Sequence, residues 1–214
     1  MENKKPLAIG LHTYSLQTNS GENLPHWNCK NAVYHISFRL ADSVPNKKRE
    51  EWLKERILLE DKINSYENNI TEKILKEYQY LYSDRIEKYL DSGFGACYLV
   101  NGEIANLVSN ALDYFEGNRY NLHAWCIMPN HVHVIVEPFE TTNDNLSKIV
   151  HSWKSFVAHK ANKILKRNGE FWQHDYFNHI IRSYQSYLYQ VQYVWTNPDN
   201  AGIKNWPYRW KKVP

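Results

Sequence analysis

The sequence predicts an α+β fold in which a β-sheet packs with α-helices and a charged helical insertion follows the first strand. Three observations predict it. Apolar and polar residues alternate in strand-like segments, two apolar runs are joined by a Pro-Asn turn, and other segments carry apolar residues at helical spacing. The expected order along the chain is strand, helical insertion, strand, helix, two strands, helix, strand and helix.

The first strand is expected in "NAVYHISFRL", residues 31–40. Its apolar and polar side chains alternate, so each set lies on one face: Tyr34, Ile36 and Phe38 on the first, His35, Ser37 and Arg39 on the second. This pattern indicates a half-buried strand with a polar face. Residues from about 46 to 90 are rich in Glu, Lys and Arg, with "NSYENN" separating two expected helices. A solvated helical hairpin that covers the sheet is the simpler interpretation, and an arm that clamps DNA is the alternative.

The middle of the chain predicts a short strand, a helix and a hairpin. "GACYLV" is the strand, and the following apolar stripe predicts a helix that stops at Gly117. "NLHAWCIM" and "HVHVIVEP" are two strands joined by "PN".

The last third predicts a helix, a strand and a second helix. Residues 146–167 have helical periodicity, and between Asn145 and Gly169 there is no acidic residue. The basic residues of this helix are Lys148, Lys154, Lys160, Lys163, Lys166 and Arg167. "EFWQHDYFNHIIR" is expected to be extended, and "SYQSYLYQVQYVWTN" to be helical until Pro198 ends the helix.

The composition fits one domain over residues 1–214, because the chain has 214 residues and 43% of them are hydrophobic. Cys29, Cys97 and Cys126 form no CxxC pair, so we expect neither a disulfide framework nor a cysteine zinc site. No apolar run approaches the length of a membrane span, and the first residues lack the apolar core of a signal peptide. We therefore expect a cytoplasmic protein with no membrane partner. The net charge of +3 does not by itself indicate nucleic-acid binding.

His131 and His133 are the first candidate site residues. In a strand they share a face, while Val132, Val134 and Val136 pack on the other. Neutral imidazole is a common metal ligand, so the pair could supply two ligands of one ion. The alternative is a pair of histidines on a polar sheet face that are satisfied by hydrogen bonds.

The last helix adds a tyrosine outside its apolar stripe. That stripe consists of Tyr184, Tyr187, Leu188, Val191, Val194 and Trp195. Tyr193 lies in a second row, and Asn197 follows it one turn later on the same side. A phenol beside an amide oxygen, brought to the histidine pair, would make a metal-assisted nucleophilic site.

At this point the chain resembles a known family. "MPNHVHVIV", "FWQHDYFNHIIR" and "QYVWTNPDNAGI", with "NWPY" after them, are similar to the REP-associated tyrosine transposases. These belong, with the IS200-type single-tyrosine transposases, to the HUH endonuclease superfamily. The resemblance covers roughly residues 32–208 and implies a ferredoxin-like antiparallel sheet packed with helices, in agreement with the element order.

The resemblance also implies roles for individual residues. His131 and His133 would be the metal-binding pair, Asn197 the third ligand and Tyr193 the nucleophile, with Mg²⁺ or Mn²⁺ as cofactor. The enzyme would nick single-stranded DNA, leaving a 5′-phosphotyrosine and a free 3′-hydroxyl. It would rejoin strands when another 3′-hydroxyl attacks the phosphotyrosine. The sequence does not identify the base that deprotonates Tyr193.

The partner implied by the resemblance is single-stranded or hairpin DNA. The candidate phosphate contacts are basic residues of the 146–167 helix and two arginines near strand ends: Lys154, Lys160, Lys163, Lys166, Arg167, Arg39 and Arg182. A solvated helix face is the alternative for the helix. Four other histidines could reach the ion if the strand register differs, although a structural or DNA-contacting role is expected for each: His35, His123, His174 and His179.

The chain departs from the family at one point. Many relatives continue "NP" with a Val-Lys-like pair, whereas this chain has Asp199 and Asn200, so an expected phosphate-contacting lysine is missing. The protein could act as a monomer or as a homodimer. Two other functions stay open: a catalytically weak, sequence-specific DNA-binding protein, and a nuclease that activates water and in which Tyr193 is structural.

Overall fold

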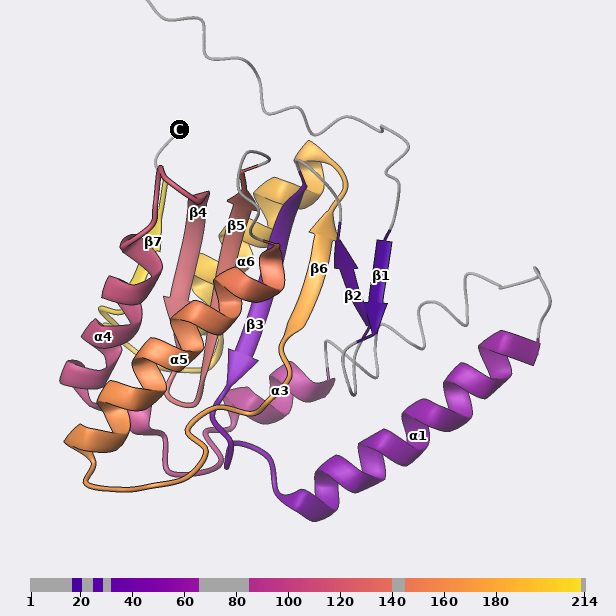
Figure 1. The fold of residues 1–214 in the computed structure, drawn as a ribbon, viewed down its shortest axis with the longest axis horizontal. Coiled ribbons are helices and arrows are strands. Elements are labelled where there is room, and N and C mark those ends of the chain that lie inside the picture. Colours follow the sequence, from indigo (N-terminus) through magenta and orange to yellow (C-terminus); the bar gives the residue numbers. More distant parts are fainter. Residues whose placement is uncertain (1–16, 21–24, 29–31, 66–84, 140–144, 213–214) are drawn as a thin grey trace, which may run out of the picture.

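The computed structural model describes residues 17–20, 25–28, 32–65, 85–139 and 145–212 (Figure 1). Its centre is a five-stranded antiparallel sheet in the order β6-β3-β5-β4-β7. The strands are β3 (Val33–Arg39), β4 (Tyr120–Ile127), β5 (His131–Pro138), β6 (Phe177–Ile181) and β7 (Arg209–Lys211). A separate two-stranded sheet is formed by β1 (Gln17–Ser20) and β2 (Pro25–Asn28).

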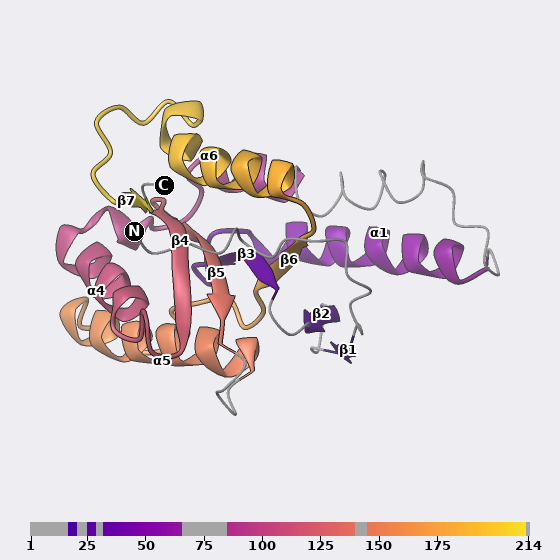
Figure 2. The same ribbon diagram turned by 90° about the horizontal axis from the view of Figure 1, so that it is seen from above.

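The topology confirms the predicted fold class. Without β7, the sheet order is fourth, first, third and second strand along the chain, which is the ferredoxin-like order. The crossover helices α4 (Gly102–Asp113) and α5 (Leu146–Ile164) cover one face, and α6 (Tyr184–Asn200) covers the other (Figure 2). The β4–β5 hairpin is also confirmed, with Ile127 opposite Val132 at its closed end.

The larger core lies between the sheet and helices α4 and α5. The expected apolar faces of β3 and β5 meet there, and all six side chains are buried: Tyr34, Ile36, Phe38, Val132, Val134 and Val136. A smaller apolar cluster lies under α6 and includes Ile135, Ile181 and Val194. Both faces of β3 are therefore covered, and the expectation of a half-buried strand is wrong. His35 and Ser37 are only 4% and 9% exposed because α6 packs over the polar face.

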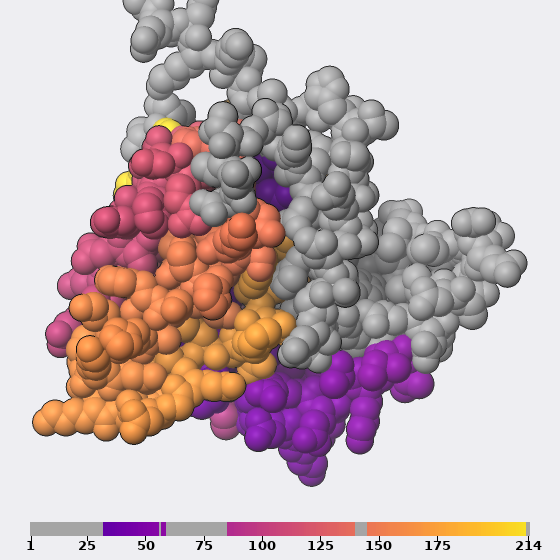
Figure 3. Space-filling model, in the orientation of Figure 1, coloured from indigo at the N-terminus to yellow at the C-terminus, as the bar shows by residue number. Residues whose placement is uncertain are grey.

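The first helix of the charged insertion does not cover the sheet. This helix, α1 (Asn46–Ser65), projects away from the body of the molecule, as Figures 1 and 3 show. Leu53, Ile57 and Leu58 are more than 40% exposed on it, since α4, α5 and α6 already occupy both sheet faces. The expected second helix falls partly on residues 66–84, which lie outside the described residues. The described end of this second helix is α3 (Arg85–Asp91), which packs beside the β4–β5 turn, where these two strands end.

Three local expectations are also wrong. "GACYLV" is not a strand, because Cys97 adopts a left-handed conformation with φ 49° and a short 3₁₀ helix, η2 (Tyr98–Val100), follows it. Helix α4 ends at Asp113, and Gly117 instead occupies a left-handed turn position. Pro198 lies inside the last turn of α6. The helix continues past it because the amide of Ala201 donates to the carbonyl of Asn197.

Among the described residues, no helix combines the length and the apolar composition needed to cross a membrane. Cys97 and Cys126 are free thiols, as expected, and Cys29 lies outside the described residues.

Candidate active site

Strand β5 and helix α6 bring polar side chains together on the sheet face that α6 covers. His131 and His133 stand at the start of β5 and are fully buried. Their Nε2 atoms are 3.1 Å apart, so the two imidazoles point at one position. Tyr193 of α6 packs its ring 5.7 Å from that of His133, nearly at right angles. The predicted convergence of the histidine pair and the tyrosine is thus present.

The loop before β5 determines which nitrogen of His131 carries hydrogen. The side-chain Nδ2 of Asn130 donates to the carbonyl oxygens of Leu90 and Phe94, so its Oδ1 is the atom that faces His131. This oxygen lies 2.7 Å from Nδ1 of His131 and can only accept. The hydrogen of His131 is therefore on Nδ1, and the lone pair of Nε2 is directed toward His133. Such an oriented imidazole is typical of metal ligands.

His133 is held from its other side by a third histidine. Its Nδ1 lies 3.0 Å from Nε2 of His35, on the neighbouring strand β3. If Nε2 of His133 is to bind a cation, its hydrogen must be on Nδ1, and Nε2 of His35 is the acceptor in place for it. His35 is thus a neighbour of the pair rather than a third side chain aimed at the same position.

Burial keeps these imidazoles neutral. Desolvation, together with a smaller effect of the nearby positive charge of Arg39, lowers the pKa of His131 to about 3. Desolvation and the neighbouring histidines hold the pKa of His133 well below its usual value. The pKa of His35 falls to about 4, again mainly through desolvation. At neutral pH these side chains therefore offer lone pairs, the form in which imidazole binds metals.

Tyr193 is half-buried, and its hydroxyl donates a hydrogen bond of 2.5 Å to Oε2 of Glu87 in α3. Burial raises the pKa of Tyr193, and the negative charge of Glu87 raises it further. A hydrogen bond between the side chain of Asn197 and the phenol lowers the pKa of Tyr193. Asn197 is itself only 1% exposed, and its Oδ1 has no hydrogen-bond partner among the described residues. A buried amide oxygen without a donor is suited to a cation.

Two acidic residues of α3 reach the site although the sequence did not single them out. Glu87 contacts Tyr193, and Oδ1 of Asp91 lies 3.7 Å from Nε2 of His131. That oxygen is buried without a hydrogen-bond partner among the described residues, and desolvation raises the pKa of Asp91 to about 6. The four-residue spacing of the two acids on one helix face was the available signal, but it lay in a segment rich in other charges.

The candidate DNA contacts are dispersed. Arg39 stands opposite His131 in the β3–β5 register, on the face of the histidine pair. Burial lowers its pKa to about 10, which leaves it charged at neutral pH. Arg182 is exposed beyond the end of β6. Lys154 is not free for DNA, because its Nζ donates to the carbonyl oxygens of Gln173 and His174 at 2.8 and 2.6 Å.

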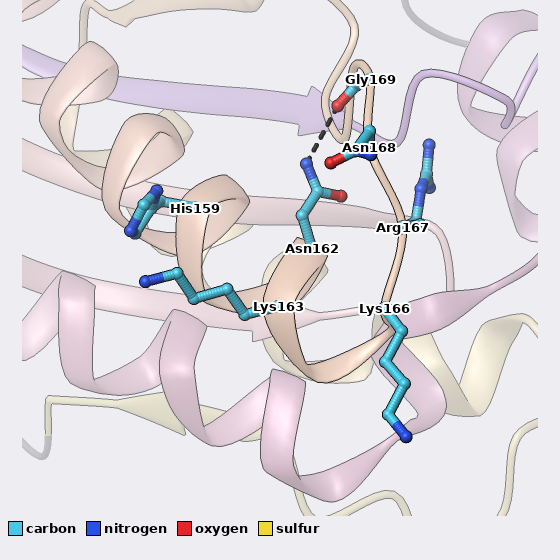
Figure 4. A pocket seen from close by; sticks show the side chains of 7 residues that line it. All are labelled: His159, Asn162, Lys163, Lys166, Arg167, Asn168 and Gly169. Carbon is cyan, nitrogen blue, oxygen red and sulfur yellow. Dashed lines mark hydrogen bonds between the residues drawn. The ribbon is translucent and has the colours of Figure 1, made fainter.

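The remaining basic candidates lie on α5, across the sheet from the histidine pair, or directly after that helix. Lys160 and Lys163 are exposed. A cavity of about 400 Å³ lies at the C-terminal end of this helix, and Figure 4 shows the side chains that line it. Its lining is mostly basic and amide side chains, with one glycine: His159, Asn162, Lys163, Lys166, Arg167, Asn168 and Gly169.

The other histidines lie away from the paired imidazoles. His123 bonds to the hydroxyl of Tyr187 at 2.9 Å, and His174 is exposed beside Asp175. His179 faces His35 across β3 and β6. Asp199, which follows Pro198, forms an ion pair with Arg209. The faces predicted from the alternation of β3 and β5 are those observed, because the predicted apolar side chains lie in the main core and the histidine pair lies on the other face.

Comparisons with known proteins found one matching family model and several relatives. Residues 99–196 match the family model described as IS200-like transposase. A REP-associated tyrosine transposase of Escherichia coli is 26% identical, over 42% of this chain and 53% of its own length. An uncharacterized protein of Haemophilus influenzae is 33% identical, over 37% of this chain and 55% of its own length.

The chain spans about half the length of the curated relatives it matches. A solved structure of a REP-associated tyrosine transposase bound to a REP hairpin superposes with a TM-score of 0.49 and 16% identity, covering 86% of this chain and 79% of the other. The matched segment begins at η2 and includes the histidine pair and Tyr193. Residues 99–196 of this chain are therefore similar to the IS200-like transposases, and two of the curated relatives are REP-associated tyrosine transposases, one of them named as putative.

Proposed function

We propose that this protein is a metal-dependent endonuclease and strand transferase for single-stranded DNA, which nicks and rejoins hairpin repeats through a 5′-phosphotyrosine at Tyr193. The observation that supports it most is the convergence of His131, His133 and Tyr193 from two distant segments onto one buried site. The names of two curated relatives, REP-associated tyrosine transposase and putative REP-associated tyrosine transposase, support a transposase function on DNA.

The donor set fits a divalent cation. His131 and His133 would hold it through Nε2, and Asn197 would add its unpartnered Oδ1. Two nitrogen ligands with bonds of about 2.1 Å to one ion lie roughly 3 Å apart, close to the observed 3.1 Å. In the described part of the chain, no group of three or more His, Cys, Asp or Glu side chains is arranged to hold a metal. The proposed ligand set therefore needs the amide oxygen of Asn197 in addition to the two histidines. When bound, Mg²⁺ or Mn²⁺ would neutralise charge on the scissile phosphate.

The side chains of the chain itself supply the rest of the reaction. Tyr193 attacks phosphorus through its phenol oxygen, and the 3′-oxygen leaves with the electron pair of the broken bond. Arg39 lies on the face of the histidine pair with its charge largely shielded from solvent, where it would bind a non-bridging phosphate oxygen. The exposed lysines Lys160 and Lys163 would bind the backbone of a hairpin stem at a distance from the cleaved bond.

A denaturing-gel assay with labelled hairpin DNAs from the flanks of the gene tests this function. The parent protein with Mg²⁺ or Mn²⁺ should form a slowly migrating covalent adduct, and Tyr193→Phe should form none. Tyr189→Phe is the matched control, because Tyr189 lies one turn earlier on α6 with its side chain 67% exposed. Cleavage that survives Tyr193→Phe would instead indicate a nuclease that activates water. Hairpin binding without any cleavage would indicate a DNA-binding protein.

A further inference from the structure

Helix α3, from the charged insertion, is fixed against the candidate active site. Leu90 is 2% exposed, and its carbonyl oxygen accepts from Asn130 in the loop that precedes His131. The carbonyl of Phe94, just after the helix, accepts from the same amide. One asparagine thus joins the end of α3 to the start of β5, and it holds α3 in a defined position beside the histidine pair.

This attachment presents Glu87 to the phenol. Glu87 lies one turn before Asp91, on the helix face that points into the site. Its Oε2 is 2.5 Å from the Tyr193 hydroxyl, within the distance that a proton transfer requires. The phenol must lose its proton when it attacks phosphorus, because a neutral phenol is a weak nucleophile.

We propose that Glu87 is the general base of Tyr193, so that the helical insertion completes the active site. The inference rests on the proposed function. In cleavage, the phenol oxygen bonds to phosphorus while its proton passes to the Glu87 carboxylate. The P–O3′ bond breaks, and the 3′-oxygen keeps the electron pair and takes a proton from water. In rejoining, a 3′-hydroxyl attacks phosphorus and loses its proton to water, and the departing Tyr193 oxygen recovers its proton from Glu87.

The test is single-turnover adduct formation by Glu87→Gln, measured beside hairpin binding by fluorescence anisotropy. Glutamine keeps the shape of the side chain but cannot take up the proton. Adduct formation should slow by about 100-fold or more, within the usual range for loss of a general base, while the Kd for hairpin DNA stays within about twofold. The rate of adduct formation by Glu87→Asp should lie between the rates of the parent and of Glu87→Gln. Glu51→Gln removes an exposed carboxylate from the same insertion and should match the parent.

A second readout separates a base from a structural partner. Replacing Tyr193 by a fluorinated tyrosine, whose phenol is more acidic, should restore much of the lost rate in Glu87→Gln and change the parent little. Parent-like or faster adduct formation by Glu87→Gln overturns the inference and leaves the proposed function intact. Failure of the fluorinated tyrosine to rescue the variant also overturns it. No adduct from the parent protein overturns the proposed function and this inference together.

Discussion

Nδ1 of His131 lies 2.7 Å from Oδ1 of Asn130, whose amide nitrogen donates to the carbonyl oxygens of Leu90 and Phe94. One buried side chain therefore orients a proposed metal ligand and holds the end of α3. A change at Asn130 should therefore affect the candidate active site and the attachment of α3 together.

Replacing Asn130 by alanine should weaken both the orientation of His131 and the attachment of α3. We expect Mn²⁺ affinity to fall about 10- to 100-fold, because His131 loses the partner that fixes its tautomer. The free energy of unfolding should fall by about 1–3 kcal/mol, because two carbonyl groups lose their donor. Calorimetric Mn²⁺ titration and urea denaturation measure the two effects. Asn110→Ala, at an exposed position of α4, is the control, and equal metal affinity in both variants would contradict the orienting role.

His35 should affect metal binding without being a ligand. In His35→Phe, Nδ1 of His133 loses its acceptor, so Mn²⁺ affinity should fall about tenfold. In His35→Gln, the amide oxygen can replace that acceptor, and affinity should recover in part. Electron paramagnetic resonance of bound Mn²⁺ reports the affinity directly. His174→Gln, which changes an exposed histidine, should behave as the parent; an unaltered affinity in His35→Phe would show that Nδ1 needs no partner.

The lysines of α5 should separate into two classes. Lys160→Gln with Lys163→Gln should weaken hairpin binding and reduce the slope of log K against log salt by about one to two, since each lost phosphate contact contributes roughly 0.7–0.9. Lys154→Met should leave that slope unchanged and lower the free energy of unfolding by about 1–3 kcal/mol, because the carbonyls of Gln173 and His174 lose their donor. Anisotropy titrations at several salt concentrations decide this. A reduced slope in Lys154→Met would mean that its ammonium contacts DNA after all.

The buried histidines should make the metal-free protein sensitive to acid. Folding lowers the pKa of His131 from 6.5 to about 3 and that of His35 to about 4. Below pH 6.5 the unfolded chain therefore binds protons that the folded protein does not. Stability is fully present above that pH and falls as the pH drops toward 4, by up to about 1.4 kcal/mol per pH unit for each histidine.

Urea denaturation in the presence of a chelator, at pH values from 7.5 to 5, measures this dependence. His35→Gln should make it shallower, and His159→Gln, at an exposed position of α5, should not. The same slope in the parent and in His35→Gln would exclude a contribution from His35.

Local periodicity determined much of the fold. The alternation of β3 and β5 predicted which side chains form the main core, and the i, i+2 spacing placed His131 and His133 on one face. The resemblance to the transposase family implied the ferredoxin-like sheet, and the observed strand order confirms it. In the same way, the four-residue spacing of Tyr193 and Asn197 predicted that they share a side of α6.

Only the tertiary structure decided what covers each face and which distant residues meet. His35 and His133 are 98 positions apart, and Glu87 and Tyr193 are 106 positions apart. No local pattern contains those pairings, because they depend on strand order and on how α3 attaches to Asn130. The projection of α1 likewise follows from α4, α5 and α6 having already covered the sheet. Side-chain periodicity is set by the geometry of one element, whereas the neighbours of a buried polar group are set by the packing of several.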